Sequence, residues 1–134
     1  MIGSMQLERR YSRDHSWAER RDGALWVGLT AHAIERLGRL TQLQFSAQPG
    51  QVLAAGAVFG NLESDKAVVD LYTPLGGRVL AVHEALVRAP ERLQEDSYLE
   101  GWLLRLEPGE AGEFSGLLDV SAYSLLLKTR AADL

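Results

Sequence analysis

The 134-residue sequence contains no cysteine. This absence excludes disulfide bonds, thiolate metal ligands and thiol nucleophiles, so any sulfur chemistry must come from a cofactor. No apolar run approaches the length of about 18 residues that a membrane span requires, and the N-terminal apolar run is too short for a signal peptide. We therefore expect a cytoplasmic protein that has no membrane partner.

Positive charge is also scarce. Lysine and arginine together number 14 against 18 aspartates and glutamates, which gives a formal charge of -4. Nucleic acid is not expected as a partner, because phosphate binding requires a basic surface. Hydrophobic residues make up 46% of the sequence and charged residues 24%, an ordinary balance for a folded globular chain.

The length indicates a single domain. The opening Met1-Ile2-Gly3-Ser4-Met5 carries a Gly-Ser dipeptide before a second methionine, which is typical of residues added during cloning. We predict that residues 1–5 are such an addition or are disordered, and that residues 6–134 form one domain.

Short apolar runs dominate the region from Tyr11 to Leu106. Glycine, proline and aspartate interrupt them at intervals of roughly ten residues, the spacing of an all-β sandwich or barrel. Asp22-Gly23 can supply the positive φ angles of a tight hairpin turn. The predicted strands cover residues 17–20, 25–29, 40–45, 52–53, 57–62, 68–72, 78–82 and 102–106.

Helices are predicted in two places. Thr30 can cap a short helix over residues 31–37, which Gly38 would end. Near the C-terminus, residues 110–118 and 121–128 have helical spacing of their apolar side chains and predict a helical tail on the β core. The leucines at 125–127 are expected to pack onto the β layer.

The polar tetrad Glu63-Ser64-Asp65-Lys66 lies between two apolar runs. Its position predicts the tip of a hairpin near residues 58–72, with Lys66 at or next to the turn. The negative charge of Glu63, Asp65 and Asp70 favours the protonated lysine, which argues against Schiff-base catalysis. Lysines of this kind are usually solvated surface residues, so the wider context has to decide whether this one is functional.

Five separated blocks supply that context. Glu63 to Ala67, followed by Asp70-Leu71-Tyr72-Thr73-Pro74 and Gly77, resembles the lipoylation segment of the glycine cleavage H-protein family. Tyr11, His15 and Trp17 resemble its N-terminal Tyr...His-x-Trp pattern.

The remaining blocks follow in the family's order. Val27-Gly28-Leu29-Thr30 resembles Val-Gly-Ile-Thr, and Glu95-Asp96-Ser97-Tyr98 with Gly101-Trp102-Leu103 resembles Glu-Asp-Pro-Tyr...Gly-Trp-Leu. The resemblance covers about residues 11–127. Several ordered blocks are more specific than any one short motif.

The resemblance implies a mainly β fold. It is the flattened β sandwich of lipoyl and biotinyl domains, a barrel-sandwich hybrid, with a modified lysine at a hairpin tip and flanking helices. It also implies a non-catalytic carrier of lipoic acid, attached by an amide bond to Lys66. The lipoyl group would accept an aminomethyl unit from the decarboxylating P protein and present it to the T protein. Dihydrolipoyl dehydrogenase would then reoxidise it.

The residues around Lys66 favour lipoate over biotin, because biotinyl domains usually place methionine on both sides of the lysine. Lipoate ligase or octanoyltransferase would attach the cofactor. We expect that enzyme to recognise Glu63, Ser64, Asp65, Ala67 and Asp70. The acidic side chains among them could also guide docking to a basic partner surface.

Other candidate sites have ordinary explanations. The histidines at 15, 32 and 83 lack metal-ligand spacing, so no metal site is predicted. The glycines at 56, 60, 76 and 77 fit turns better than a phosphate-binding loop. The three tryptophans are expected in the core.

Five residues depart from the family pattern and leave the pathway open. They are Ser16, Ala31-His32, Asp65 and His83. Alternative functions are a lipoate-binding protein of another pathway, such as lipoyl relay or sulfur oxidation, and an unmodified interaction module.

Overall fold

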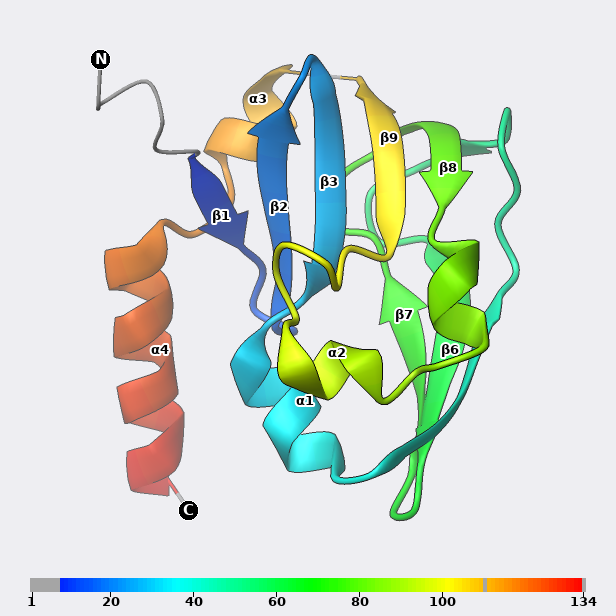
Figure 1. Ribbon diagram of the computed structural model, residues 1–134. Coiled ribbons are helices and arrows are strands. Elements are labelled where there is room, and N and C mark those ends of the chain that lie inside the picture. Colours follow the sequence, from blue (N-terminus) through cyan, green and yellow to red (C-terminus); the bar gives the residue numbers. More distant parts are fainter. Residues whose placement is uncertain (1–7, 110, 134) are drawn as a thin grey trace.

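Two antiparallel sheets face each other across the main core of the protein (Figure 1). The computed structural model describes residues 8–109 and 111–133. The larger sheet has the strand order β1-β2-β3-β9-β8-β5, and the smaller sheet has the order β4-β6-β7. The predicted mainly β sandwich is confirmed.

The strands are β1 (Arg9–Tyr11), β2 (Ser16–Arg21), β3 (Ala24–Leu29), β4 (Leu40–Phe45), β5 (Val52–Leu53), β6 (Val58–Ser64), β7 (Val68–Tyr72), β8 (Gly77–Val82) and β9 (Leu104–Pro108). The helices are α1 (Ala31–Leu37), the 3-10 helix η2 (Glu84–Val87), α2 (Arg92–Glu95), α3 (Ala111–Ser115) and α4 (Val120–Asp133). In Figure 1, α1 and α2 lie at the same end of the larger sheet, and α4 runs beside β1.

Local sequence signals explain two features that were predicted correctly, the β2–β3 turn and the bounds of α1. In the β2–β3 hairpin, Asp22 has φ 51° and Gly23 has φ 77°, and Arg21 pairs with Ala24. In α1, the hydroxyl oxygen of Thr30 accepts a hydrogen bond from the backbone N–H of Ala33, and the helix ends at Gly38. The positive φ of 82° at Gly38 suits a residue without a Cβ atom.

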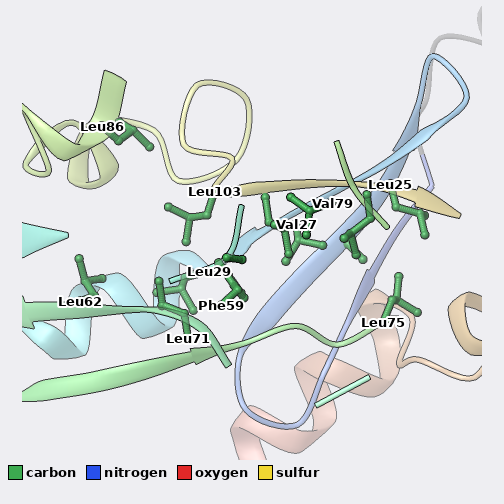
Figure 2. Packing of buried hydrophobic residues seen from close by; sticks show 14 of the residues in the cluster. Leu25, Val27, Leu29, Phe59, Leu62, Leu71, Leu75, Val79, Leu86 and Leu103 are labelled. Atoms are coloured by element: carbon green, nitrogen blue, oxygen red, sulfur yellow. The ribbon is translucent and has the colours of Figure 1, made fainter. Parts of the chain in front are cut away.

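The main core lies between the sheets, and Figure 2 shows its packing. Val27, Leu29 and Val79 come from the larger sheet. They face Leu62 and Leu71 from the smaller sheet in the same cluster. Each fully buried side chain of this size contributes roughly 2 kcal/mol to folding through removal of apolar surface from water.

A second, aromatic cluster joins the larger sheet to α4. Its buried members are Tyr11, Trp17 and Tyr123, and the rings of Tyr11 and Tyr123 stack with centroids 4.6 Å apart. Trp26 and Trp102 are half-buried against this cluster. The prediction for the tryptophans is thus confirmed fully only for Trp17.

The predicted C-terminal tail is helical, but its boundaries were wrong. Residues 110–118 do not form one helix, because α3 ends at Ser115 and Leu118 exchanges two backbone hydrogen bonds of 2.8 Å with Tyr11. Glu110 lies outside the described residues, as do residues 1–5. The second predicted helix, residues 121–128, is the longer α4.

The leucines of α4 divide between the core and solvent. Leu126 and Leu127 pack against the aromatic cluster, as expected. Leu125 is 65% exposed, so the prediction that all three pack inward was wrong for this residue.

The other differences between the predicted and the observed secondary structure are small. Strand β1, η2 and α2 were not predicted, and β9 begins at Leu104 rather than at Trp102. Among the described helices, none is long and apolar enough to span a membrane.

Candidate functional site

Lys66 lies in the turn between β6 and β7, and this hairpin extends to one end of the protein (Figure 1). Its strands pair with Leu62 opposite Val69 and Glu63 opposite Val68. Leu62 and Leu71 are buried in the main core and hold the base of the hairpin there. The hairpin therefore presents its tip from a fixed base.

Ser64 organises the tip. Its backbone N–H donates to the carbonyl oxygen of Ala67 at 2.8 Å. Its hydroxyl oxygen accepts hydrogen bonds from the backbone N–H groups of Lys66 at 3.1 Å and Ala67 at 3.2 Å. This arrangement is a side-chain-stabilised turn, the kind that serine forms readily.

The tip is also attached to the neighbouring corner between α1 and β4. The backbone N–H of Asp65 donates to the carbonyl oxygen of Arg39 at 3.0 Å. On the adjacent strand, the hydroxyl of Thr41 donates to the carbonyl oxygen of Glu63 at 3.2 Å. The hairpin therefore has contacts near its tip as well as at its base.

The structure brings five of the six predicted site residues together at this tip. Asp65, Lys66 and Ala67 are exposed, Glu63 is half-buried and Ser64 is buried. In the part of the chain that the structure describes, neither Asp65 nor Lys66 forms an ion pair. The amine of Lys66 is thus accessible to an enzyme, and the tip fits the covalent attachment of an acyl group.

The sixth residue, Asp70, lies away from the tip. It pairs with Asn61 along the hairpin and lines a groove of about 470 Å³. The apolar lining of this groove comes from Leu29, Ala33, Leu37, Val69 and Tyr72. Asp70 therefore belongs to a different feature from the other predicted residues.

Three polar residues that sequence reasoning did not assign also line this groove. They are Asp14, His15 and Arg36. They come from the β1–β2 connection and from α1, so no spacing in the sequence shows that they meet Asp70. The positive φ of 69° at His15 is visible only in the structure.

The histidines form no cluster that could hold a metal within the described residues. A ring nitrogen of His15 lies 2.8 Å from the hydroxyl of Tyr123. The ring of His83 stacks on Trp102 with a centroid distance of 4.2 Å.

The positions that depart from the family pattern are dispersed. Ser16 is buried, and its hydroxyl donates to the carbonyl oxygen of Tyr72 at 3.4 Å. The ring of His32 lies 4.8 Å from the ring of His15, measured between centroids. Asp65 is at the tip. His83 contacts Trp102, which does not line the groove.

Comparison with known proteins identifies the family. The family model described as Glycine cleavage H-protein matches residues 9–130. The glycine cleavage system H protein of Nitrosomonas europaea is 40% identical over 129 residues, which cover 96% of this chain and 98% of that protein. The H protein of Anaeromyxobacter sp. strain K is 37% identical over 119 residues, covering 89% and 92%.

A solved structure gives the same result. The crystal structure of a glycine cleavage system H protein from Mycobacterium marinum matches with a TM-score of 0.79 and 34% sequence identity. The match covers 90% of this chain and 97% of that chain. Sequence and fold agree over nearly the whole chain, and the protein belongs to the glycine cleavage H-protein family.

Proposed function

We propose that this protein is the lipoyl carrier of a glycine cleavage system, with lipoic acid attached through an amide bond to Nζ of Lys66. Glycine cleavage H proteins are carrier subunits that bear lipoate. The observation that supports this site is the exposed lysine at the tip of a hairpin whose base is buried in the core. We also propose that residues 6–134 form one domain, since the core cluster includes residues from Ala18 to Phe114.

The sequence offers two lysines for modification, Lys66 and Lys128. Lys128 is exposed on α4, in the middle of a regular helix. An attaching enzyme has to take the amine and its flanking backbone into its own active site. A protruding hairpin tip allows this more easily than a helix does, which favours Lys66.

The protein would hold the cofactor in place, and the cofactor would provide the reactive group. When bound, lipoic acid contributes a disulfide that can accept the aminomethyl unit and two electrons. The two strands of the hairpin fix the base of the attached group, so its reactive end stays at high local concentration near each bound enzyme.

The groove beside β7 could assist the same role. Its apolar residues Leu37 and Val69 would exclude water from a bound hydrocarbon chain. The carboxylates of Asp14 and Asp70 in the same groove would attract a cationic group.

The proposed partners are the P protein, the T protein, dihydrolipoyl dehydrogenase and a lipoate ligase or octanoyltransferase in the cytoplasm. The carrier would itself catalyse none of their reactions. Asp65 is exposed and Glu63 half-buried at the tip, so both could meet basic side chains of an approaching enzyme.

Mass spectrometry after incubation with lipoate, ATP and a purified lipoate ligase tests the site. We expect one lipoyl increment on the peptide that contains Lys66. Lys66→Arg should remain unmodified, and Lys128→Arg should be modified like the wild type. An unmodified wild-type protein would contradict the proposal and would favour an interaction module.

The pathway needs a separate assay. The lipoylated protein should support exchange of bicarbonate with the carboxyl carbon of glycine in the presence of P protein, and Lys66→Arg should not. A lipoylated wild type that supports no exchange would contradict the glycine cleavage assignment. It would point to a lipoyl carrier of another pathway.

A further inference from the structure

The side chain of Lys66 lies against Gly38, the residue that ends α1. A Cβ atom placed on Gly38 would come within 3.3 Å of Cε and 3.6 Å of Cδ of Lys66. It would also approach Oδ1 of Asp65 to 3.0 Å. The lysine methylenes therefore border the space that a side chain at position 38 would need, and Cε would have to move by a few tenths of an ångström to admit it.

Two hydrogen bonds hold this corner in place. The bond from Asp65 N–H to the carbonyl oxygen of Arg39 joins it to the hairpin tip. The side-chain amide of Gln94, on α2, donates to the carbonyl oxygen of Gly38 at 3.0 Å. The position of the corner relative to Lys66 is thus set by α2 and by the hairpin together.

Contact with this surface restricts a side chain that is otherwise flexible. A surface lysine samples many rotamers, and an enzyme that binds the amine must select one of them. A lysine whose methylenes already rest on a rigid surface loses less conformational freedom in that step. Small errors in the placement of reacting atoms lower rates strongly, so such a surface can influence attachment.

We propose that the corner formed by Gly38 and Arg39 positions the Lys66 side chain for cofactor attachment. This inference rests on the proposed function of Lys66. In the reaction, Nζ bonds to the carbonyl carbon of the lipoyl adenylate, the bond from that carbon to the phosphate oxygen breaks, and AMP leaves with the electron pair. The ammonium group loses two protons in becoming the amide. Gly38 is a positioning residue, because it acts through Lys66 and the neighbouring Asp65 and does not touch the reacting atoms.

The test compares Gly38→Ala with Gly23→Ala. Both glycines have positive φ angles, 82° and 77°, so an alanine is strained at either position. A Cβ on Gly23 would meet nothing within 4 Å. Both variants carry backbone strain, and the strain is greater at Gly38 because its ψ of -149° lies in a region that is essentially restricted to glycine. Only Gly38→Ala also crowds Asp65 and Lys66.

Attachment rates are measured with lipoate, ATP and purified lipoate ligase, by intact mass against time. We expect kcat/KM to fall about tenfold for Gly38→Ala and by less than about twofold for Gly23→Ala. Gln94→Leu removes the hydrogen bond to Gly38 without touching Lys66 and should lower kcat/KM about threefold. Thermal unfolding of all three variants shows whether each is folded at the assay temperature.

The contact between Gly38 and Lys66 can also be tested directly, without the attaching enzyme. In NMR spectra of the unmodified wild type, Gly38 Hα should show nuclear Overhauser contacts to the Hδ and Hε protons of Lys66. Absence of these contacts would overturn the proposal. Equal rates for the two alanine variants, or faster attachment to Gly38→Ala, would also overturn it.

A different result would show that the proposed function itself is wrong. The wild type would then stay unmodified in the same assay even if the NMR contacts were present. That result would overturn the role in attachment together with the function on which it rests.

Discussion

Trp17 and Gly28 face each other on β2 and β3, and the indole of Trp17 occupies the space next to Gly28. A Cβ atom on Gly28 would lie 2.7 Å from three atoms of the indole ring. Trp17 is completely buried, and its N–H donates to the carbonyl oxygen of Ser97 at 2.9 Å. One contact therefore joins three segments that resemble the H-protein family, around Trp17, Gly28 and Ser97.

Gly28→Ala should lower the free energy of unfolding by about 1–3 kcal/mol, because the added methyl group overpacks a dense interior. Urea denaturation followed by tryptophan fluorescence measures this loss. Trp17→Phe frees part of the space, so the double variant should lose less stability than the sum of the two single changes. Strictly additive losses would show that crowding against Trp17 is not the cause.

Glu19→Ala should destabilise the protein by about 3 kcal/mol, since removal of one partner leaves buried or half-buried charges without compensation. Glu19 is 1% exposed and accepts hydrogen bonds from Arg9 at 2.8 Å and Arg21 at 2.6 Å. The exposed pair Arg78–Glu107 is the control, and Glu107→Ala should change stability by less than about 1 kcal/mol. Equal effects in chemical denaturation would contradict the structural role of Glu19.

Ser64→Ala should slow cofactor attachment about fivefold, because the turn loses the hydroxyl that accepts from two backbone N–H groups. The rate is measured by mass spectrometry with lipoate ligase. Ser64→Thr keeps the hydroxyl and should retain most of the activity. Ser46→Ala, at an exposed serine, is the control. Normal attachment to Ser64→Ala would show that this turn is not needed for recognition.

Tyr123→Phe should lower stability by about 1 kcal/mol and increase hydrogen exchange along α4. The lost hydroxyl lies 2.8 Å from a ring nitrogen of His15 and 2.9 Å from the hydroxyl of Thr30, so it connects α4 to the main body of the protein. Leu125→Ser, at an exposed position of the same helix, should change stability by less than about 0.5 kcal/mol. Unchanged exchange in Tyr123→Phe would show that the hydroxyl is not needed to hold α4 and that the packing of its apolar side chains is sufficient.

Asp96→Asn should lower the thermal midpoint at neutral pH, and this difference should shrink in acid. The backbone N–H of Tyr98 is the main group that lowers the pKa of Asp96 below its ordinary value of 3.8, with further help from Leu99 and Glu100. A lowered pKa means that the ionised carboxylate stabilises the folded state. That stabilisation is complete above the ordinary value and is lost as the pH falls through the lowered one. A difference in midpoint that persists at the lowest pH would contradict this account.

Several features could be predicted from the sequence because local interactions determine them. Asp22-Gly23 tolerates the positive φ angles that a two-residue hairpin turn requires. Thr30 and Gly38 bound α1 through capping. The polar tetrad that ends at Lys66 lies between two apolar runs that form strands, although only Leu71 of the second run is buried, so its position indicated the tip of a hairpin.

The end of α3 could not be predicted in this way. Helical spacing continues through Leu118, but that residue satisfies its backbone groups with Tyr11 on β1. The partner is more than 100 positions away in the sequence, so long-range pairing overrides local propensity here.

The β pattern, the hairpin that carries Lys66 and the family to which the protein belongs could all be predicted without the structure. These depend on neighbouring residues and on the order of short blocks. Three other relations are visible only in the folded protein: Glu19 is buried between two arginines, Asp70 lines a groove with Asp14, and Gly38 lies against Lys66. Each of these relations joins segments that meet only when the sheets pack, and burial and steric contact depend on distance in space rather than on spacing along the chain.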